Sequence, residues 1–269
     1  MLVTDNTKDM FDIEVEKVPL YNGGRTRFDM IVDKTYGHQL AAVTKQYPLV
    51  QNEDFITAAE HAMYDLGGDL GDFNFRQGEY YNGKSRFRYS LPDMNFSVYG
   101  DQSKIWPGVV FGNNYAAQGS LWVAYEAWRQ VCSNGMMGWG IVRLNSIQHR
   151  GTIDYDRLYN EIYAGLQILI DKFATERIVA ETMAQTTVST KQVNEYIDMV
   201  LENTAKKYEE TIINNMKSNI RELGQTAWAM SQAITETSTH DMKTWGADDW
   251  ARKNVHALIE STVNAPALV

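Results

Sequence analysis

Residues 111–135 read FGNNYAAQGSLWVAYEAWRQVCSNG, and this stretch decides the fold. From Leu121 to Trp128, aromatic and aliphatic residues alternate with a period of two, which is typical of a β-strand. Bulky side chains occupy both parities, with Leu121 and Tyr125 on one and Trp122 and Trp128 on the other. We therefore expect a central strand of a sheet with something packed on each of its faces.

Shorter strands and one helix are expected before this stretch. The helix begins at Asn52, a good N-cap residue, and ends at about Leu66, before Gly67-Gly68. Asn82-Gly83 is the strongest signal for a β-hairpin turn in the chain. Alternating apolar and polar residues predict three further strands, at Phe11–Val18, Thr26–Asp33 and Gln39–Thr44.

After about Thr152 the apolar residues recur at helical spacing instead. The pattern predicts a long helix to Met183, a second capped by Ser189-Thr190, and three more at about Ala205–Leu223, Trp228–Thr237 and from Asp248. The expected fold class is α+β, an antiparallel meander with hairpins packed on a helix, followed by a helical half. The expected organisation is a β-rich core, 1–150, with the inserted helix at 52–66, and a helical region, 151–269, packed on it as one unit.

The composition is that of an ordinary globular protein, with 269 residues, 44% hydrophobic and 22% charged. The single cysteine, Cys132, excludes an intramolecular disulfide and a cysteine-based zinc cluster. No apolar run approaches the roughly 18 residues of a membrane span, and the acidic N-terminus lacks a signal-peptide pattern. We therefore expect a cytoplasmic protein that does not contact membranes.

The charge is distributed unevenly along the chain. The net charge is −9, but residues 74–150 carry 8 Lys/Arg and 4 Asp/Glu, whereas both flanking segments are acidic. The same segment holds 14 of the 31 aromatic residues. A local basic surface can bind phosphates whatever the overall charge, and aromatic faces can stack bases. This mixture favours binding of single-stranded nucleic acid.

The candidate residues follow from type and strand phase. We expect phosphate contacts from seven cations: Lys84, Arg86, Arg88, Lys104, Arg129, Arg143 and Arg150. We expect base stacking from three aromatic residues: Tyr81, Trp106 and Tyr115. Two alternatives stay open: the aromatic residues could be core packing, and the arginines could form a solvated sheet face.

Catalytic patterns are weak. Glu236 and His240 lie four residues apart and could hold a metal as in a nuclease, but two ligands are too few. Cys132 has no nearby histidine to activate it as a nucleophile. The glycine-rich pieces match no nucleotide-binding motif. We therefore expect no catalytic residues, no metal, no cofactor and no enzymatic activity.

Several short motifs resemble a phage- and plasmid-encoded family known as domain of unknown function nine hundred and thirty-two. They are Val18–Tyr21, Tyr47–Glu53, Asn113–Tyr115 with Gly119-Ser120, Arg129–Asn134, and Gly224–Trp228 with Ala233–Glu236 and His240. The order of the motifs matches along nearly the whole chain. The sequence departs from the family pattern at Ser231-Gln232, where Tyr-Asn is usual, and at Thr237, where Tyr is usual.

The expected layout of hairpins over a helix also resembles the single-strand annealing recombinases of the Rad fifty-two, RecT and Red-beta superfamily. This resemblance implies a homo-oligomer, ring or filament, that binds and anneals single-stranded DNA without a nucleotide cofactor in the host cytoplasm. It implies a phage or host single-strand-binding protein or exonuclease as a further partner. The alternative is an anti-defence protein whose acidic surface mimics DNA and occupies a host nuclease.

Overall fold

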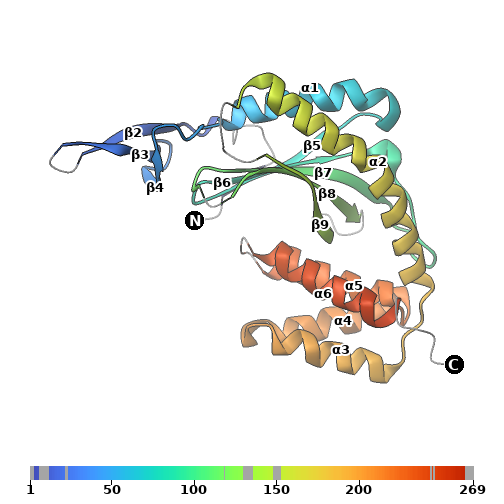
Figure 1. Cartoon of the computed structure of the whole chain (residues 1–269). Coiled ribbons are helices and arrows are strands. Elements are labelled where there is room, and N and C mark those ends of the chain that lie inside the picture. The colour runs from blue at the N-terminus through green and yellow to red at the C-terminus, as the bar shows by residue number, and fades with distance from the viewer. Residues whose placement is uncertain are drawn as a thin grey trace. The chain divides into compact units, whose positions relative to one another are not determined.

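The computed structural model describes residues 3–5, 12–21, 24–117, 119–129, 136–147, 153–242, 244 and 246–263 (Figure 1). For residues 3–5, 25, 68–70, 136–147, 169–171 and 248 it describes the backbone alone. The chain forms two compact units, each built from three separate segments. The first contains residues 1–93, 108–125 and 143–170, and the second contains residues 94–107, 126–142 and 171–269. These units cut across the boundary that the sequence suggests near residue 150.

Most strands belong to one antiparallel sheet, in which β8 is an interior strand as the sequence predicts. All of β8 is buried except Trp122, because neighbouring strands flank it and both of its faces are covered. The strand order is β1-β5-β6-β7-β8-β9. The bounds are β1 Val3–Asp5, β5 Asn74–Tyr81, β6 Lys84–Ser90, β7 Ile105–Asn114, β8 Leu121–Arg129 and β9 Met136–Ile147.

The turn between β5 and β6 is the hairpin that the sequence predicts. Asn82 and Gly83 both have positive φ angles, 46° and 77°, as a two-residue hairpin turn requires. The carbonyl oxygen of Gly83 accepts a hydrogen bond from the N–H of Tyr115 at 2.6 Å. A Cβ atom at Gly83 would lie 2.9 Å from the Leu40 side chain, so glycine also permits this close packing.

A second, three-stranded antiparallel sheet precedes the first helix, in the order β2-β3-β4 (Figure 1). Tyr80 of β5 ties it to the large sheet: its hydroxyl donates to the buried carboxylate of Asp33, and its ring stacks on Tyr36 at 5.4 Å. The bounds are β2 Val15–Tyr21, β3 Arg25–Asp33 and β4 His38–Thr44. The sequence predicts β3 and β4 to within a residue, but β2 lies further along the chain than the predicted Phe11–Val18.

Helix α1, Asn52–Leu70, packs on the large sheet within the first unit. The ring of Phe55 meets Phe111 of β7 edge to face at 6.1 Å, and Phe111 meets Tyr89 of β6 at 5.8 Å. Burial of each of these rings stabilises the fold by about 1.5–3 kcal/mol. The helix runs past Gly67-Gly68 and ends at Leu70, before Gly71, whose φ of 79° favours glycine. The predicted end at about Leu66 was therefore too early.

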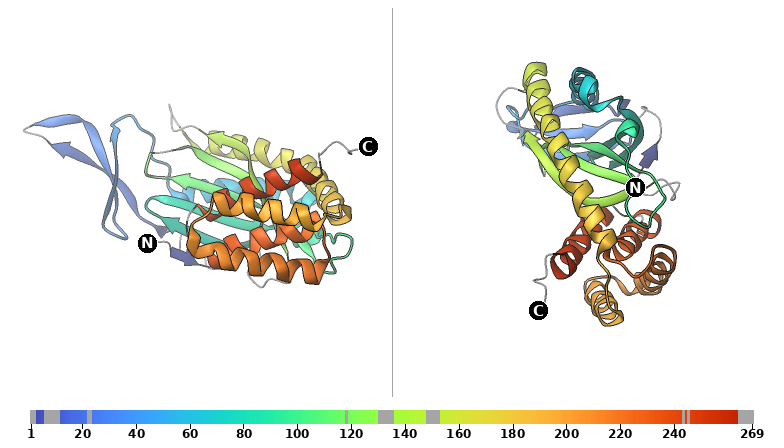
Figure 2. Two further views of the ribbon diagram at one scale, coloured as in Figure 1. Left: turned by 90° about the horizontal axis from the view of Figure 1, so that it is seen from below. Right: turned by 90° about the vertical axis from the view of Figure 1, so that its right-hand side faces the viewer.

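Helix α2, Tyr155–Gln185, is the long helix that the sequence predicts, and its first half lies beside α1 (Figure 1). The second unit holds four more helices, which lie side by side in Figure 2. They are α3 Thr190–Glu202, α4 Glu209–Leu223, α5 Ala227–Glu236 and α6 Ala247–Thr262, and a π-helical turn, Thr237–Asp241, follows α5. The α+β fold class is therefore confirmed. Within the described ranges, no helix combines the length and apolarity needed to cross a bilayer.

The N-terminus of α3 carries a complete capping box. The Ser189 hydroxyl accepts from the N–H of Gln192 at 3.3 Å, and the Gln192 side chain accepts from the N–H of Ser189 at 2.8 Å. Replacing Ser189 with alanine is expected to lower the free energy of unfolding by about 0.5–2 kcal/mol, because a helix N–H loses its acceptor. Urea unfolding followed by circular dichroism measures the change. Ser218→Ala, at an exposed position inside α4, is the matched control and should change stability by less than about 0.5 kcal/mol.

Candidate functional site

The two faces of the large sheet carry different kinds of side chain. Phe87 and Tyr89 of β6 point toward α1, where the Tyr89 hydroxyl donates to Glu60 at 2.9 Å. Side chains alternate along a strand, so Lys84, Arg86 and Arg88 lie on the opposite face. We call this surface of β5 to β8 the basic face. The sequence predicts this alternation, and the register of the sheet agrees with it.

Two of the three cations on the basic face are engaged within the fold. Arg88 is fully buried, and its Nη2 atom lies 3.1 Å from Oε2 of Glu79 on β5. Arg86 is 8% exposed and lies directly opposite Glu79, with 3.8 Å between Nη1 and Oε2. The expectation that Arg86 and Arg88 contact phosphates is therefore wrong in this structure, because a buried guanidinium needs a carboxylate partner and both find one in Glu79 on the next strand.

A pair made of one aromatic and one cationic residue lies at the hairpin end of the basic face. Tyr81 and Lys84 are cross-strand neighbours at the last rung of the β5–β6 ladder, and both are half-buried. Side chains at such positions stand about 5 Å apart at Cβ, so the phenol ring and the ammonium group share one end of the sheet. Asn114 of β7 is the other neighbour of Lys84. The structure thus brings together one predicted phosphate-binding residue and one predicted stacking residue.

An aromatic ring that is not among the predicted stacking candidates also lies on the basic face. Trp122 of β8 covers the backbone of Gly112, where a Cβ atom would lie only 2.0 Å from Cε2 of the indole. Gly112 in turn pairs with Arg86. The glycine is needed here because any side chain would displace the ring. The signal in the sequence was a glycine inside a strand, which often marks the close approach of another group.

Tyr115 has a structural position instead of a stacking one. It is 1% exposed, and its hydroxyl accepts from the backbone N–H of Asn52 at 2.6 Å. Burial raises its pKa well above the usual range. The prediction of Tyr115 as a stacking residue is therefore wrong in this structure, since no face of its ring is open to a base.

Asn52 also differs from its expected role as an N-cap. Gln51 is the N-cap, and the side chain of Asn52 is buried between strands. Its Nδ2 donates to Ser85 Oγ at 3.0 Å, and its Oδ1 accepts from Asn113 Nδ2 at 2.9 Å. Asn113 also donates to the carbonyl oxygen of Val50 at 3.0 Å. Two motifs more than sixty residues apart thus meet in one buried amide network that fixes the start of α1.

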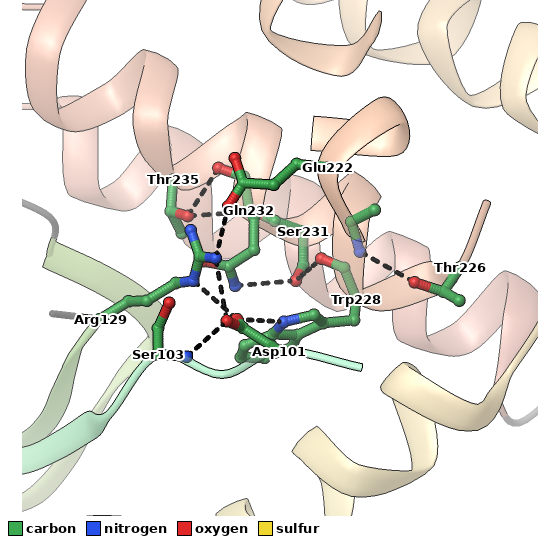
Figure 3. A network of polar contacts seen from close by, with 10 residues as sticks. Asp101, Ser103, Arg129, Glu222, Thr226, Trp228, Ser231, Gln232 and Thr235 are labelled. Atoms are coloured by element: carbon green, nitrogen blue, oxygen red, sulfur yellow. Dashed lines mark hydrogen bonds and ion pairs between the residues drawn. The ribbon is translucent and has the colours of Figure 1, made fainter. Parts of the chain in front are cut away.

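Arg129, the fifth predicted phosphate ligand, lies at the centre of a second buried network (Figure 3). Its Nε and Nη2 atoms donate to the two carboxylate oxygens of Asp101 at 2.6 and 3.0 Å. Nη2 also donates to Oε1 of Glu222 on α4 at 2.9 Å. The indole N–H of Trp228 donates to Asp101 at 3.0 Å. Arg129 is 4% exposed, so the prediction that it contacts phosphates is wrong in this structure.

The electrostatics of this network follow from its hydrogen bonds. Burial alone would raise the pKa of Asp101, but donors from Arg129, the backbone of Ser103 and Trp228 outweigh it and lower that pKa. Burial alone would lower the pKa of Arg129, but hydrogen bonds to Asp101 and Glu222 outweigh it and raise that pKa. Both groups therefore stay ionised, as a buried ion pair requires.

The remaining candidates divide between the two units. Lys104 is exposed and Trp106 is half-buried, both in the second unit. Arg143 lies in β9, where the backbone alone is described, and Arg150 and Cys132 lie outside the described residues. The carboxylate of Glu236 accepts from Asn219 at 2.7 Å. Across the described part of the chain, no three His, Cys, Asp or Glu side chains gather as metal ligands would.

The carboxylates Asp101 and Glu79 are structural partners of predicted phosphate ligands that sequence reasoning missed. Residues 74–150 hold four acids among eight cations. Two of these acids, Glu79 and Asp101, are the partners of buried arginines. The available signal was an acidic residue inside a segment rich in cations and aromatic residues. Such a residue indicates a buried ion pair, because a buried arginine needs a carboxylate.

The buried networks bring together residues from several of the separated motifs. Residues 39–261, most of the chain, match the family described as Domain of unknown function (DUF932). The chain belongs to this family. The matched DUF932 region contains the Asn52–Asn113 network and the Asp101–Arg129–Trp228 network. Comparisons with curated proteins and with solved structures return no match.

Proposed function

We propose that this DUF932 protein binds single-stranded DNA and promotes its annealing, as a homo-oligomer and without a nucleotide cofactor. The observation that carries the proposal is the pairing of Tyr81 with Lys84 at the β5–β6 hairpin. An ammonium group beside an aromatic ring supplies the two elements of sequence-independent single-strand binding, a phosphate contact and a stacking surface. The basic and aromatic composition of residues 74–150 supports the same proposal.

The proposed mechanism requires no bond to be made or broken by the protein. Lys84 and its equivalents in other protomers hold the phosphates of an extended strand, and Tyr81 supports a base by stacking. The remaining base edges stay open to a complementary strand. Annealing then follows from the raised local concentration of ordered strands, and release follows because a duplex no longer offers a base to stack.

The burial of three arginines makes assembly part of this proposal. Because Arg86, Arg88 and Arg129 are engaged by carboxylates, three of the seven predicted phosphate ligands are taken up within the fold of one protomer. Weak contacts of single protomers with one DNA strand give a high total affinity only when the protomers are linked. Once the first protomer has bound, binding of the next one to the same strand is then intramolecular. A ring or filament in the host cytoplasm would supply that repetition. The similarity to annealing recombinases belongs to this proposal and points the same way.

Fluorescence anisotropy of a labelled oligothymidylate, combined with size-exclusion chromatography of the same sample, tests the proposal. We expect binding at low salt by a large assembly, with affinity that falls as salt rises. Tyr81→Ala should weaken binding about tenfold, because the stacked base loses its support. Lys191→Ala, on the exposed surface of α3, removes a cation outside the proposed site and should leave affinity unchanged. Absence of binding at low salt would contradict the proposal.

A further inference from the structure

A ladder of tyrosines lies on α2 where it runs beside α1. Tyr155, Tyr159 and Tyr163 stack in sequence, with ring centroids 6.4 and 5.7 Å apart and rings within 24° of parallel. Residues on α1 hold two of the hydroxyl groups. Tyr155 contacts Nδ1 of His61, and the Tyr159 hydroxyl donates to Asp65 at 2.6 Å. The ladder is therefore ordered before any partner binds.

Tyr64 lies on α1 three residues after His61 and one residue before Asp65, the two residues that hold the ladder. It exposes 84% of its surface, more than any other large hydrophobic residue among those described, and Tyr155 exposes 41%. Such exposure adds little to folding stability. Tyrosine is enriched at protein interfaces because it offers a large contact area at low entropic cost. Tyr64 and the ladder together form what we call the tyrosine surface.

The charges around the tyrosine surface select the kind of partner. Helix α1 contains five acidic residues and no lysine or arginine. The adjoining half of α2, up to Ile170, adds Asp156 and Glu161 against a single cation, Arg157. Asp65 beside Tyr159 and Asp54 about two turns before His61 stay exposed. A phosphate chain would be repelled here, whereas a cationic side chain would meet both carboxylates and ring faces.

We propose that the tyrosine surface docks a lysine- or arginine-rich segment of a partner protein. Guanidinium groups of that segment lie over the rings of Tyr64 and Tyr155, and Asp65 accepts their hydrogen bonds. This site is separate in its chemistry from the Tyr81–Lys84 pair, which selects an anion. One protomer could therefore hold a DNA strand and a basic protein segment at the same time.

A labelled octa-arginine peptide is the probe, and anisotropy at moderate salt is the measurement. Tyr64→Ala leaves the net charge unchanged and should weaken peptide binding about tenfold, because a cation loses its aromatic partner. Tyr99→Ala is the matched control, since Tyr99 is 73% exposed but lies in the other compact unit. This control should change peptide affinity by less than about twofold. Circular dichroism confirms that both variants fold.

Three results would overturn the inference. Equal affinities of both variants for the peptide would mean that overall acidity alone attracts it. A later elution of Tyr64→Ala in size exclusion would identify a second copy of this chain as the occupant. Loss of oligothymidylate binding by Tyr64→Ala would assign the surface to nucleic acid. Retained DNA binding with weakened peptide binding supports the inference, so the two proposals can fail separately.

Discussion

Replacing Arg129 with alanine is expected to lower the free energy of unfolding by about 3–5 kcal/mol. The substitution leaves the carboxylate of Asp101, itself 4% exposed, without the cation that compensates its burial. Glu222 on α4 loses the same partner. Urea unfolding followed by circular dichroism measures the loss.

Two comparisons make this result specific to the ion pair. Arg221→Ala removes an exposed arginine from α4 and should cost less than about 0.5 kcal/mol. Removing Asp101 as well, in the double variant with Arg129→Ala, should cost much less than the two single losses added together, because the two residues act as one unit. Additive losses would mean that Arg129 and Asp101 contribute independently.

Arg88→Ala is expected to lower the free energy of unfolding by about 2–5 kcal/mol, because it opens a void at a fully buried position and leaves Glu79 with Arg86 as its remaining cation. Lys84→Ala, on the same strand and the same face, removes a half-buried ammonium and should cost less than about 1 kcal/mol. Thermal and urea unfolding of both variants measure the difference. A stable Arg88→Ala protein that has lost DNA binding would restore Arg88 as a phosphate ligand and contradict its structural role.

The elements that the sequence predicts well are those with local causes. Asn82-Gly83 dictates its turn through backbone conformation, and Ser189 with Gln192 dictates a helix start through hydrogen bonds three residues apart. The interior strand β8 was predictable because both of its faces are apolar. Each of these signals spans fewer than ten residues and needs no knowledge of the chain's path.

The roles of the buried polar residues depended on partners far along the chain. Asn52 has the right chemistry for an N-cap, yet Ser85 and Asn113 recruit its side chain into the sheet. Arg129 has the charge of a phosphate ligand, yet Asp101 neutralises it across 28 residues. A positive charge on a strand does not reveal whether solvent or a carboxylate will face it. Strand order and register settle that question, and they are non-local.

The dependence of oligothymidylate affinity on salt concentration, measured for the wild-type protein and Lys84→Ala, tests the proposed DNA contact most directly. Each phosphate contact on a single strand contributes about −0.7 to the slope of log K against log salt. If Lys84 contacts one phosphate in each protomer, its removal should make the slope per protomer shallower by about that amount. Lys191→Ala should retain the wild-type slope. Identical slopes for wild type and Lys84→Ala, or no binding by either, would contradict the proposal.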